Sequence, residues 1–370
     1  MPEPEAPLLN EILESALVKV TANATAFGHK VPTFGNPHTG RYLLSPHVND
    51  WSSGYWAGLL WLTFVATGNP AIRTLGRGFL EPFRARLEKR VRLGVDIGPV
   101  YLLGARANHQ LSADPAAREL ALRAADELLG FYRIQHKCLL SAEAVRGSLL
   151  QIDALMSLPL LWWAQALTGD SRYGEAALHH ADTTLTRLLR PDGSVHAAQW
   201  PDGTPETLFG FRPGSVWARG QAYAIYGFTL AAEWTGEERY ASAALHAARY
   251  FMGALPETAV PNWDFDREAP RLSDSAAAAI AAGGMLRLAR ITAAYGREWL
   301  IAAAQQLMIA LIVNCLETVP NAQGLLRHGV WDWPARMGVD SYVIAGDYFF
   351  VETLLALQNR APDFWGLVSY

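Results

Sequence analysis

The chain has 370 residues, a formal net charge of -4 and 51% hydrophobic residues, which is ample apolar material for a large core. Its Lys and Arg residues are scattered and form no basic stripe, which argues against a nucleic-acid-binding protein. Cys138 and Cys315 lie far apart, without metal-binding or disulfide spacing, so we expect both to be buried as small apolar residues.

Neither the first residues nor the apolar runs indicate export or membrane insertion. Residues 1–7 are acidic and rich in proline, with no basic segment ahead of an apolar one. The most apolar run, 307–315, is too short to cross a bilayer. We therefore expect a cytoplasmic protein with no membrane partner and no nucleic-acid partner.

Helical patterns extend along the chain, and strand-like alternation is scarce. The more polar helices show one apolar face at helical spacing, as formed by Leu120, Ala124, Leu128 and Phe131, and by Tyr240, Ala244, Ala247 and Phe251. Between them we predict helices that are apolar or small on nearly every side, at 98–107, 153–167, 221–234, 275–289 and 342–357. Helices of this second kind are buried.

The buried helices begin at recurring motifs near residues 51, 95, 151, 217, 272 and 339. A period on this scale indicates repeated helical pairs. An open solenoid would need a polar last repeat, but the final buried helix is as apolar as the middle ones. We therefore predict an all-α fold, an (α/α)6 barrel forming a single domain over residues 1–370, with the tail beyond Ala361 peripheral.

In a closed ring of this kind, the N-terminal ends of the inner helices point to one side. We expect the chemically capable residues at these ends to converge on one pocket; they are Trp51, Asp96, Asp153, Trp217, Arg219, Gln221, Asp274, Asp340 and Asp347. Asp274 and Asp340 lie in segments typical of helix caps, so we expect a structural role for both. For Arg219, binding a sugar carboxylate and forming a structural ion pair are equal alternatives.

Tryptophan is unusually common, with 13 residues, and several lie in polar surroundings: Trp51, Trp200, Trp263, Trp331 and Trp333. Amphipathic aromatic faces suit the apolar faces and polar rim of a pyranose ring. Extra aromatic mass in a helical core is the alternative. With two carboxylates in the same pocket, the sequence permits acid–base chemistry on a sugar.

Asp153 is an acidic residue in an otherwise apolar segment, 148–169. Position alone favours a helix N-cap or a first-turn acid. The matching position of Asp96 at the start of another buried helix weakens that interpretation and leaves a catalytic pair as an open alternative. The sequence contains no phosphate-binding loop, dinucleotide fingerprint, zinc-protease motif or nucleophile elbow, so we expect no metal and no organic cofactor.

Several motifs resemble the unsaturated glucuronyl hydrolases, the eighty-eighth glycoside hydrolase family. In chain order they are WSSGYWAGLLW (51–61), DIGPVYLL (96–103), IDALMSLPLLWWA (152–164), DGSVH (192–196), WARGQAYAIYGF (217–228), VPNWDFD (260–266), DSAAAAIAAGG (274–284) and GDYFFVE (346–352). The resemblance covers most of the chain and implies an (α/α)6 barrel.

The resemblance also implies a reaction and a set of roles. The family hydrates the C4=C5 double bond of an unsaturated uronic acid at the non-reducing end of an oligosaccharide. By resemblance, Asp153 is the general acid and base, and Asp96 is its partner. The same motifs imply a set of substrate-binding residues: Trp51, Trp56, His196, Trp217, Arg219, Gln221, Tyr223, Trp263 and Tyr348.

The sequence departs from the family pattern near the expected sugar site. The family usually carries His before the first Asp, where this chain has Val95, and His-Gln where it has Leu208 and Phe209. Tyr223 stands where a Trp is usual. Because a pocket that hydrogen-bonds its substrate rejects analogues strongly, such changes can redirect specificity.

Three functions are compatible with the sequence. The first is a hydrolase of a small unsaturated uronyl oligosaccharide or a related enol-ether glycoside. The second is another (α/α)6 sugar enzyme, such as an unsaturated rhamnogalacturonyl hydrolase, an epimerase or an ordinary glycosidase. The third is a non-catalytic sugar-binding protein, which retention of both Asp96 and Asp153 makes the least favoured. In each case the partner is a small carbohydrate and the protein a monomer or homodimer.

Overall fold

The computed structural model describes residues 6–143 and 147–366, so residues 1–5 of the proline-rich segment lie outside the described part. The helices are α1 (Ala6–Phe27), α2 (Ser52–Thr67), α3 (Pro70–Gly78), α4 (Leu80–Glu88), α5 (Ile97–Tyr101), α6 (Ala107–Ser112), α7 (Pro115–Leu129), α8 (Leu158–Thr168), α9 (Ser171–Arg187), α10 (Ala218–Thr235), α11 (Glu238–Gly253), α12 (Ser275–Ile291), α13 (Ala294–Asn314) and α14 (Ile344–Leu357). A π-helical segment, η1 (Leu102–Arg106), joins α5 to α6, and a 3₁₀ helix, η2 (Ile152–Ser157), precedes α8.

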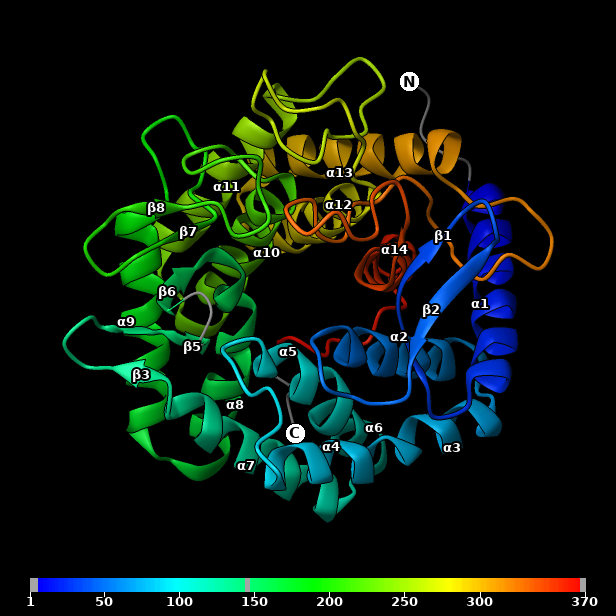
Figure 1. Ribbon diagram of the computed structural model, residues 1–370, viewed down its shortest axis with the longest axis horizontal. Helices are drawn as coiled ribbons and strands as arrows, with labels where there is room; N and C mark the ends of the chain where they lie inside the picture. The colour runs from blue at the N-terminus through cyan, green and yellow to red at the C-terminus, as the bar shows by residue number, and fades with distance from the viewer. Residues whose placement is uncertain (1–5, 144–146, 367–370) are drawn as a thin grey trace.

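The inner helices form a closed ring (Figure 1). Around it, α10 packs against α12, α12 against α14, and α14 against α2, and the ring continues through α5 and η1 to η2 and back to α10. Inner helices α2, α8, α10 and α12 each pack on the outer helix that follows, and α1 contacts both α2 and α14. The predicted (α/α)6 barrel is therefore confirmed.

Small residues bring the starts of three inner segments together. A Cβ on Gly54 of α2 would come within 2.5 Å of Val100 Cα in α5. A Cβ on Gly98 would come within 2.3 Å of Ser157 Cα in η2, and the Ser157 hydroxyl donates to the Val95 carbonyl. Because glycine has no Cβ, the backbones can approach this closely, which places the start of α5 beside η2.

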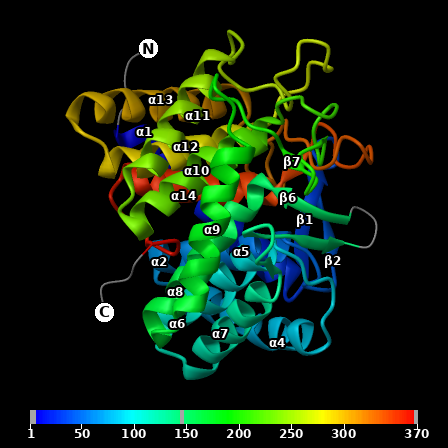
Figure 2. The same ribbon diagram turned by 90° about the vertical axis from the view of Figure 1, so that its left-hand side faces the viewer.

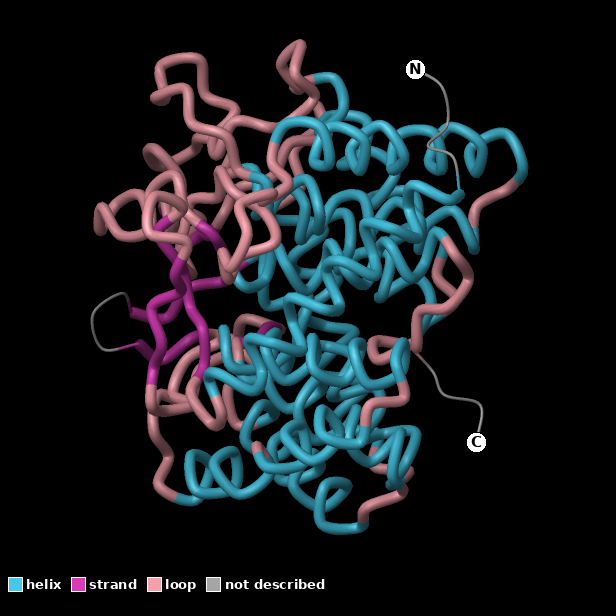
Figure 3. Tube along the Cα trace, turned by 90° about the vertical axis from the view of Figure 1, so that its right-hand side faces the viewer, coloured by secondary structure: helices cyan, strands magenta, loops and turns pink. Residues whose placement is uncertain are grey.

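Short strands that the helical prediction missed lie at one end of the barrel, together with the longest loops (Figures 2 and 3). They are β1 (Val31–Asn36), β2 (Arg41–Ser45), β3 (Tyr132–Arg133), β4 (Cys138–Leu139), β5 (Ser141–Glu143), β6 (Gly147–Gln151), β7 (Ala198–Gln199), β8 (Pro205–Glu206) and β9 (Tyr342–Val343). They pair in the orders β2-β1-β9, β3-β4 and β5-β6-β7-β8. Segment 148–169 is consequently a strand, then η2, then α8.

Residues 362–366, the described part of the tail beyond Ala361, are packed into the barrel, which corrects the prediction that this part is peripheral; residues 367–370 lie outside the described part. Phe364 and Trp365 are fully buried. The Arg106 guanidinium donates to the carbonyls of Phe364 and Gly366, and the Trp365 indole donates to Glu352 at 2.8 Å. These contacts close the end of the barrel where the inner helices finish.

Apolar residues of α13 are used in helix packing. By length and composition alone, Gly296–Asn314 could cross a membrane. In the fold this helix is the outer partner of α12, and Leu300, Leu307 and Leu311 are fully buried.

Both cysteines are buried and free, as predicted from their spacing.

Candidate active site

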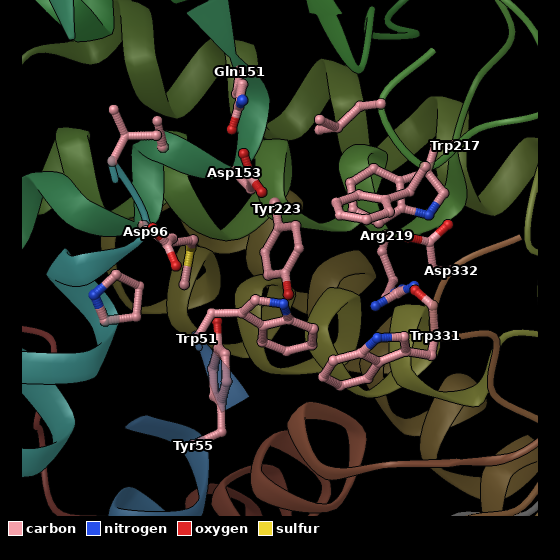
Figure 4. A pocket seen from close by; sticks show the side chains of 16 residues that line it. Trp51, Tyr55, Asp96, Gln151, Asp153, Trp217, Arg219, Tyr223, Trp331 and Asp332 are labelled. Carbon is pink, nitrogen blue, oxygen red and sulfur yellow. The ribbon is translucent and has the colours of Figure 1, made fainter. Parts of the chain in front are cut away.

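A pocket of about 320 Å³ lies at the end of the barrel where the inner helices begin (Figure 4). Such a volume is at the lower end of what small-molecule sites enclose. The structure brings six predicted site residues together in its wall: Trp51, Asp96, Asp153, Trp217, Arg219 and Tyr223. The remaining lining residues are Tyr55, Val95, Pro99, Gln151, Ala154, Met156, Leu208, Phe209, Trp331 and Asp332.

The two carboxylates come from neighbouring inner segments. Asp96 immediately precedes α5, and Asp153 is the second residue of η2. The close contact between Gly98 and Ser157 fixes these segments against each other. Gln151 occupies the N-cap position of η2, so Asp153 is not an N-cap, but it is an acidic residue in the first turn of η2, as the other form of that interpretation predicted.

Aromatic rings form two walls of the pocket. Trp51 and Trp331 stack with their ring centroids 4.3 Å apart and an interplanar angle of 16°. Across the pocket, Phe209 packs against Trp217 at 5.2 Å. Rings of this kind combine an apolar face with, in tryptophan, a polar N–H, which suits the face and rim of a sugar.

Two tyrosine hydroxyls lie near Asp153 and share a hydrogen bond. Burial raises the pKa of Tyr55 well above its usual value, and the hydrogen bond with Tyr223 and the charge of Asp153 act in the same direction. Burial likewise raises the pKa of Tyr223, to about 12. Both phenols therefore stay protonated at neutral pH and can act as hydrogen-bond donors beside the carboxylate.

Arg219 is engaged by protein groups on two sides. Its Nε lies 2.9 Å from an Asp274 oxygen, and its Nη2 donates to the carbonyls of Val330 and Trp331. The guanidinium also lies over the Trp217 ring, 5.0 Å from its centroid. Of the two alternatives for Arg219, the structure shows the ion pair, and it links α10 to the loop that carries Trp331 (Figure 4).

An apolar turn, residues 207–210, supplies part of the pocket wall. Leu208 has a positive φ of 53°, and the turn is closed by hydrogen bonds between Thr207 and Gly210. The buried carboxylate of Asp264 accepts the Phe211 N–H at 2.9 Å and so holds the turn from outside. Leu208 and Phe209 of this turn, and separately Val95, add apolar side chains to the pocket wall.

Three aromatic residues predicted to bind substrate do not line the pocket. Trp56 is buried on the outer side of α2, where its ring packs 5.4 Å from Phe27. Trp263 is fully buried and donates its indole N–H to the Pro270 carbonyl. Tyr348 lies deeper in the barrel, and its hydroxyl donates to Glu352. The assignment of these residues to the sugar site is corrected by their burial in the core.

Two predicted polar residues are also elsewhere. Gln221 is two positions after Arg219, so its side chain leaves α10 on another face, and its amide bonds Val195 N–H and the Gly193 carbonyl. His196 packs on Arg190, with Nδ1 2.8 Å from the guanidinium. Burial and the Arg190 charge lower the pKa of His196 to about 4. Both residues hold the 191–199 loop instead of lining the pocket.

The other acidic residues expected at this end also have structural contacts. Asp274 is buried against Arg219 and caps α12, as its capping pattern predicted. Asp347 is buried, and its carboxylate accepts from Tyr42 and from two backbone N–H groups. Asp340 is exposed beside His328 at 2.7 Å and is no helix cap. Asp340 and Asp347 do not line the pocket.

Sequence reasoning missed several lining residues. Tyr55 lies within the first quoted motif, four positions after Trp51, and that helical spacing could have identified it. Gln151 directly precedes the Asp153 motif but belongs to β6, which was not predicted. Asp332 follows Trp331 in a loop hairpin whose ends pair through Gly329 and Ser341, and nothing in the sequence separates it from other loop acids.

Similar proteins of known activity identify the family of this chain. No family model matches the chain. The chain is 33% identical over 373 residues to the unsaturated glucuronyl hydrolase of Bacillus sp. strain GL1, covering 96% of this chain and 98% of the relative. The chain belongs to the unsaturated glucuronyl hydrolase family. It is also 30% identical to the unsaturated chondroitin disaccharide hydrolase of Streptococcus pyogenes serotype M1, over 96% of this chain and 93% of that protein.

Solved structures of the family agree with this assignment. The crystal structure of the Bacillus sp. GL1 enzyme superposes with a TM-score of 0.91 at 32% identity and covers 98% of this chain and all of that one. The unsaturated glucuronyl hydrolase of Streptococcus agalactiae gives a TM-score of 0.92 at 26% identity, over 99% of this chain and 95% of that one. As a member of this family, the chain is a hydrolase enzyme with the (α/α)6 fold.

Proposed function

We propose that this unsaturated glucuronyl hydrolase hydrates the C4=C5 double bond of an unsaturated uronic acid at the non-reducing end of a small oligosaccharide. Asp153 is the general acid and base, and Asp96 is its partner. The observation that carries the proposal is the convergence of these two carboxylates in one aromatic-walled pocket. Relatives support the substrate class, since an enzyme of S. agalactiae in a substituted form has been solved with dGlcA-GalNAc6S.

The proposed chemistry uses one proton donor and one water. Asp153 gives its proton to C4 while water, deprotonated by the same residue, adds to C5, so the double bond becomes a hemiketal. The hemiketal then opens, the ring oxygen leaves C5 as a ketone forms, and the hemiacetal at C1 releases the remaining sugar as an alcohol. A positioned acid–base group contributes about 10²- to 10⁴-fold to such a step.

The residues around the pair supply binding and orientation. Trp51 and Trp331 offer a stacked aromatic surface to the sugar face. The phenols of Tyr55 and Tyr223 are donors that can reach a substrate oxygen near Asp153. Asp96, at the start of α5, lies in the same wall and is suited to orient the ring hydroxyls.

The test is the Asp153→Asn variant assayed on an unsaturated uronyl disaccharide, with loss of the double-bond absorbance as the readout. Since an amide cannot donate or accept the required proton, kcat should fall by about 10²- to 10⁴-fold. Circular dichroism and thermal melting should show an intact fold. Asp202→Asn is a matched control, because Asp202 is exposed on a loop outside the pocket, and it should keep wild-type turnover.

The absorbance readout also separates the alternatives. Only hydration of the double bond removes the absorbance, so an ordinary glycosidase or an epimerase would leave it unchanged. Near-normal turnover by Asp153→Asn would reject the assignment of Asp153, and absence of turnover on every unsaturated uronyl substrate would reject the proposed reaction.

A further inference from the structure

The charges that line the pocket are mostly negative. Among the described lining residues, Asp96, Asp153 and Asp332 carry carboxylates, and Arg219 carries the single positive charge. That charge is already matched by Asp274 in an ion pair from which water is excluded. For an anionic group on a substrate, the pocket wall therefore provides a single guanidinium, which already has protein partners and could bind one substrate carboxylate at most.

Asp332 lies away from the proposed acid–base pair. Figure 4 shows it beside Trp331 and Arg219, on the side of the pocket opposite Asp96. The proposed function puts the unsaturated ring at Asp96 and Asp153, so a second sugar that continues across the same pocket would come to Asp332. This acid is thus placed to meet substituents on the second sugar.

The Asp332 side chain is held in position by its own hairpin. Its Oδ1 accepts the Ala335 N–H at 2.9 Å, and its backbone pairs with Met337. Among the described residues it forms no ion pair. The cation of the same hairpin, Arg336, lies over the Trp333 ring at 3.7 Å and does not line the pocket. Neither this arginine nor another described cation is therefore paired with the Asp332 carboxylate.

We infer that Asp332 is a specificity-determining residue that selects substrates whose second sugar is uncharged, and so excludes sulfated ones. The inference rests on the proposed function and deepens it. A sulfate near Asp332 would meet a like charge, and the one cation among the described lining residues, Arg219, is already paired with Asp274. Like-charge contacts at a binding site strongly disfavour the wrong partner. The apolar side chains of Val95, Leu208 and Phe209, which also line the pocket, carry no polar atom that could bond a sulfate.

The experiment compares unsaturated chondroitin disaccharides that are identical except for a sulfate: unsulfated, 4-sulfated and 6-sulfated. For the wild-type enzyme, kcat/KM should be about tenfold or more higher on the unsulfated disaccharide, as expected for an uncompensated like charge. The ratio should shrink as salt is raised, because ions screen charges at the rim. Asp332→Asn, whose amide oxygen can still accept the Ala335 N–H, should lower the ratio several-fold.

Asp340→Asn is the matched control, since it removes the same charge from the same loop at an exposed position outside the pocket. It should leave the ratio at the wild-type value. Equal turnover of sulfated and unsulfated disaccharides by the wild-type enzyme, or an unchanged ratio in Asp332→Asn, would overturn the inference while leaving the proposed function intact. Lack of turnover of all three disaccharides in the wild-type enzyme, with the double-bond absorbance unchanged, would instead reject the proposed function and the inference with it.

Discussion

Arg219 shows how one side chain can shape the pocket through protein contacts. Its guanidinium joins three elements: α10, the start of α12 through Asp274, and the loop that carries Trp331. Burial raises the pKa of Asp274 and the Arg219 charge opposes that shift, so the guanidinium favours the charged form of this carboxylate. Arg219 therefore positions Trp331 against Trp51, in addition to any contact with substrate.

Replacing Arg219 with Met should leave Asp274 buried without its cation. Breaking a buried pair in this way costs about 3–5 kcal/mol of unfolding free energy, measurable by urea denaturation. Arg219→Lys should recover part of that stability but not the wild-type KM, because an ammonium cannot reproduce the planar fork that bonds Asp274 and two carbonyls.

The exposed pair of Arg239 and Asp182 provides the control for this loss. Arg239→Met should change stability by less than about 1 kcal/mol, as surface pairs do. If Arg219→Met were as stable as Arg239→Met, the ion pair would not organise this end of the barrel.

At the level of elements, helical periodicity predicted the fold because a helix that is buried on all sides is apolar on all sides, which the sequence shows directly. The ring of α2, α10, α12 and α14 follows from apolar runs that no surface helix could carry. The short strands did not follow, since six of the nine in the described part are only two or three residues long, too short to show the alternation that predicts a strand. Thus Asp153 was correctly placed at the pocket although its segment was predicted as one helix.

The site was predicted less completely than the fold, for a related reason. Residues of one motif are neighbours in the sequence, but their side chains leave the helix on different faces. In α10, Arg219 faces the pocket while Gln221 faces the 191–199 loop, and in α2, Tyr55 faces the pocket while Trp56 faces α1. Deciding between neighbours needs the helix rotation, which tertiary packing sets.

The contact between α5 and η2 gives a prediction about an element. Gly98→Ala places a Cβ within 2.3 Å of Ser157 Cα, so the two backbones must separate. Because Asp96 and Asp153 lie on these segments, kcat/KM should fall by about 10-fold or more, as displacements near 1 Å can reduce rates even further. The fall should accompany a loss of about 1–3 kcal/mol in stability from overpacking.

Gly253→Ala is the matched substitution at the end of α11, where an added Cβ meets nothing within 4 Å. It should leave kcat/KM at the wild-type value and change the unfolding free energy by less than about 1 kcal/mol. Wild-type kinetics in Gly98→Ala would show that the spacing of α5 and η2 does not control the carboxylate pair.

On the scale of the molecule, the two ends of the barrel are used differently. Where the inner helices begin, long loops and short strands gather (Figure 3), and the pocket lies at this end. Where they finish, the chain segment 361–366 closes the barrel through a polar network, in which Arg287 pairs with Glu233 and Asp363. Trp365 inserts above Phe349 with the rings stacked 6.0 Å apart. The closed end contributes stability, and the open end contributes chemistry.

This division predicts that Trp365→Ala destabilises the enzyme without altering its chemistry. Removing a fully buried Trp costs about 3–5 kcal/mol, and here it also leaves Glu352 without the indole N–H, so Tm should fall by several degrees. Since Trp365 does not line the catalytic pocket, kcat/KM measured well below Tm should stay at the wild-type value. The control is Trp299→Ala, because Trp299 is 37% exposed on α13 and its loss should cost far less. A large drop in kcat/KM for Trp365→Ala, at a temperature where the fold is intact, would show that the two ends of the barrel are coupled and that the closed end also governs the site.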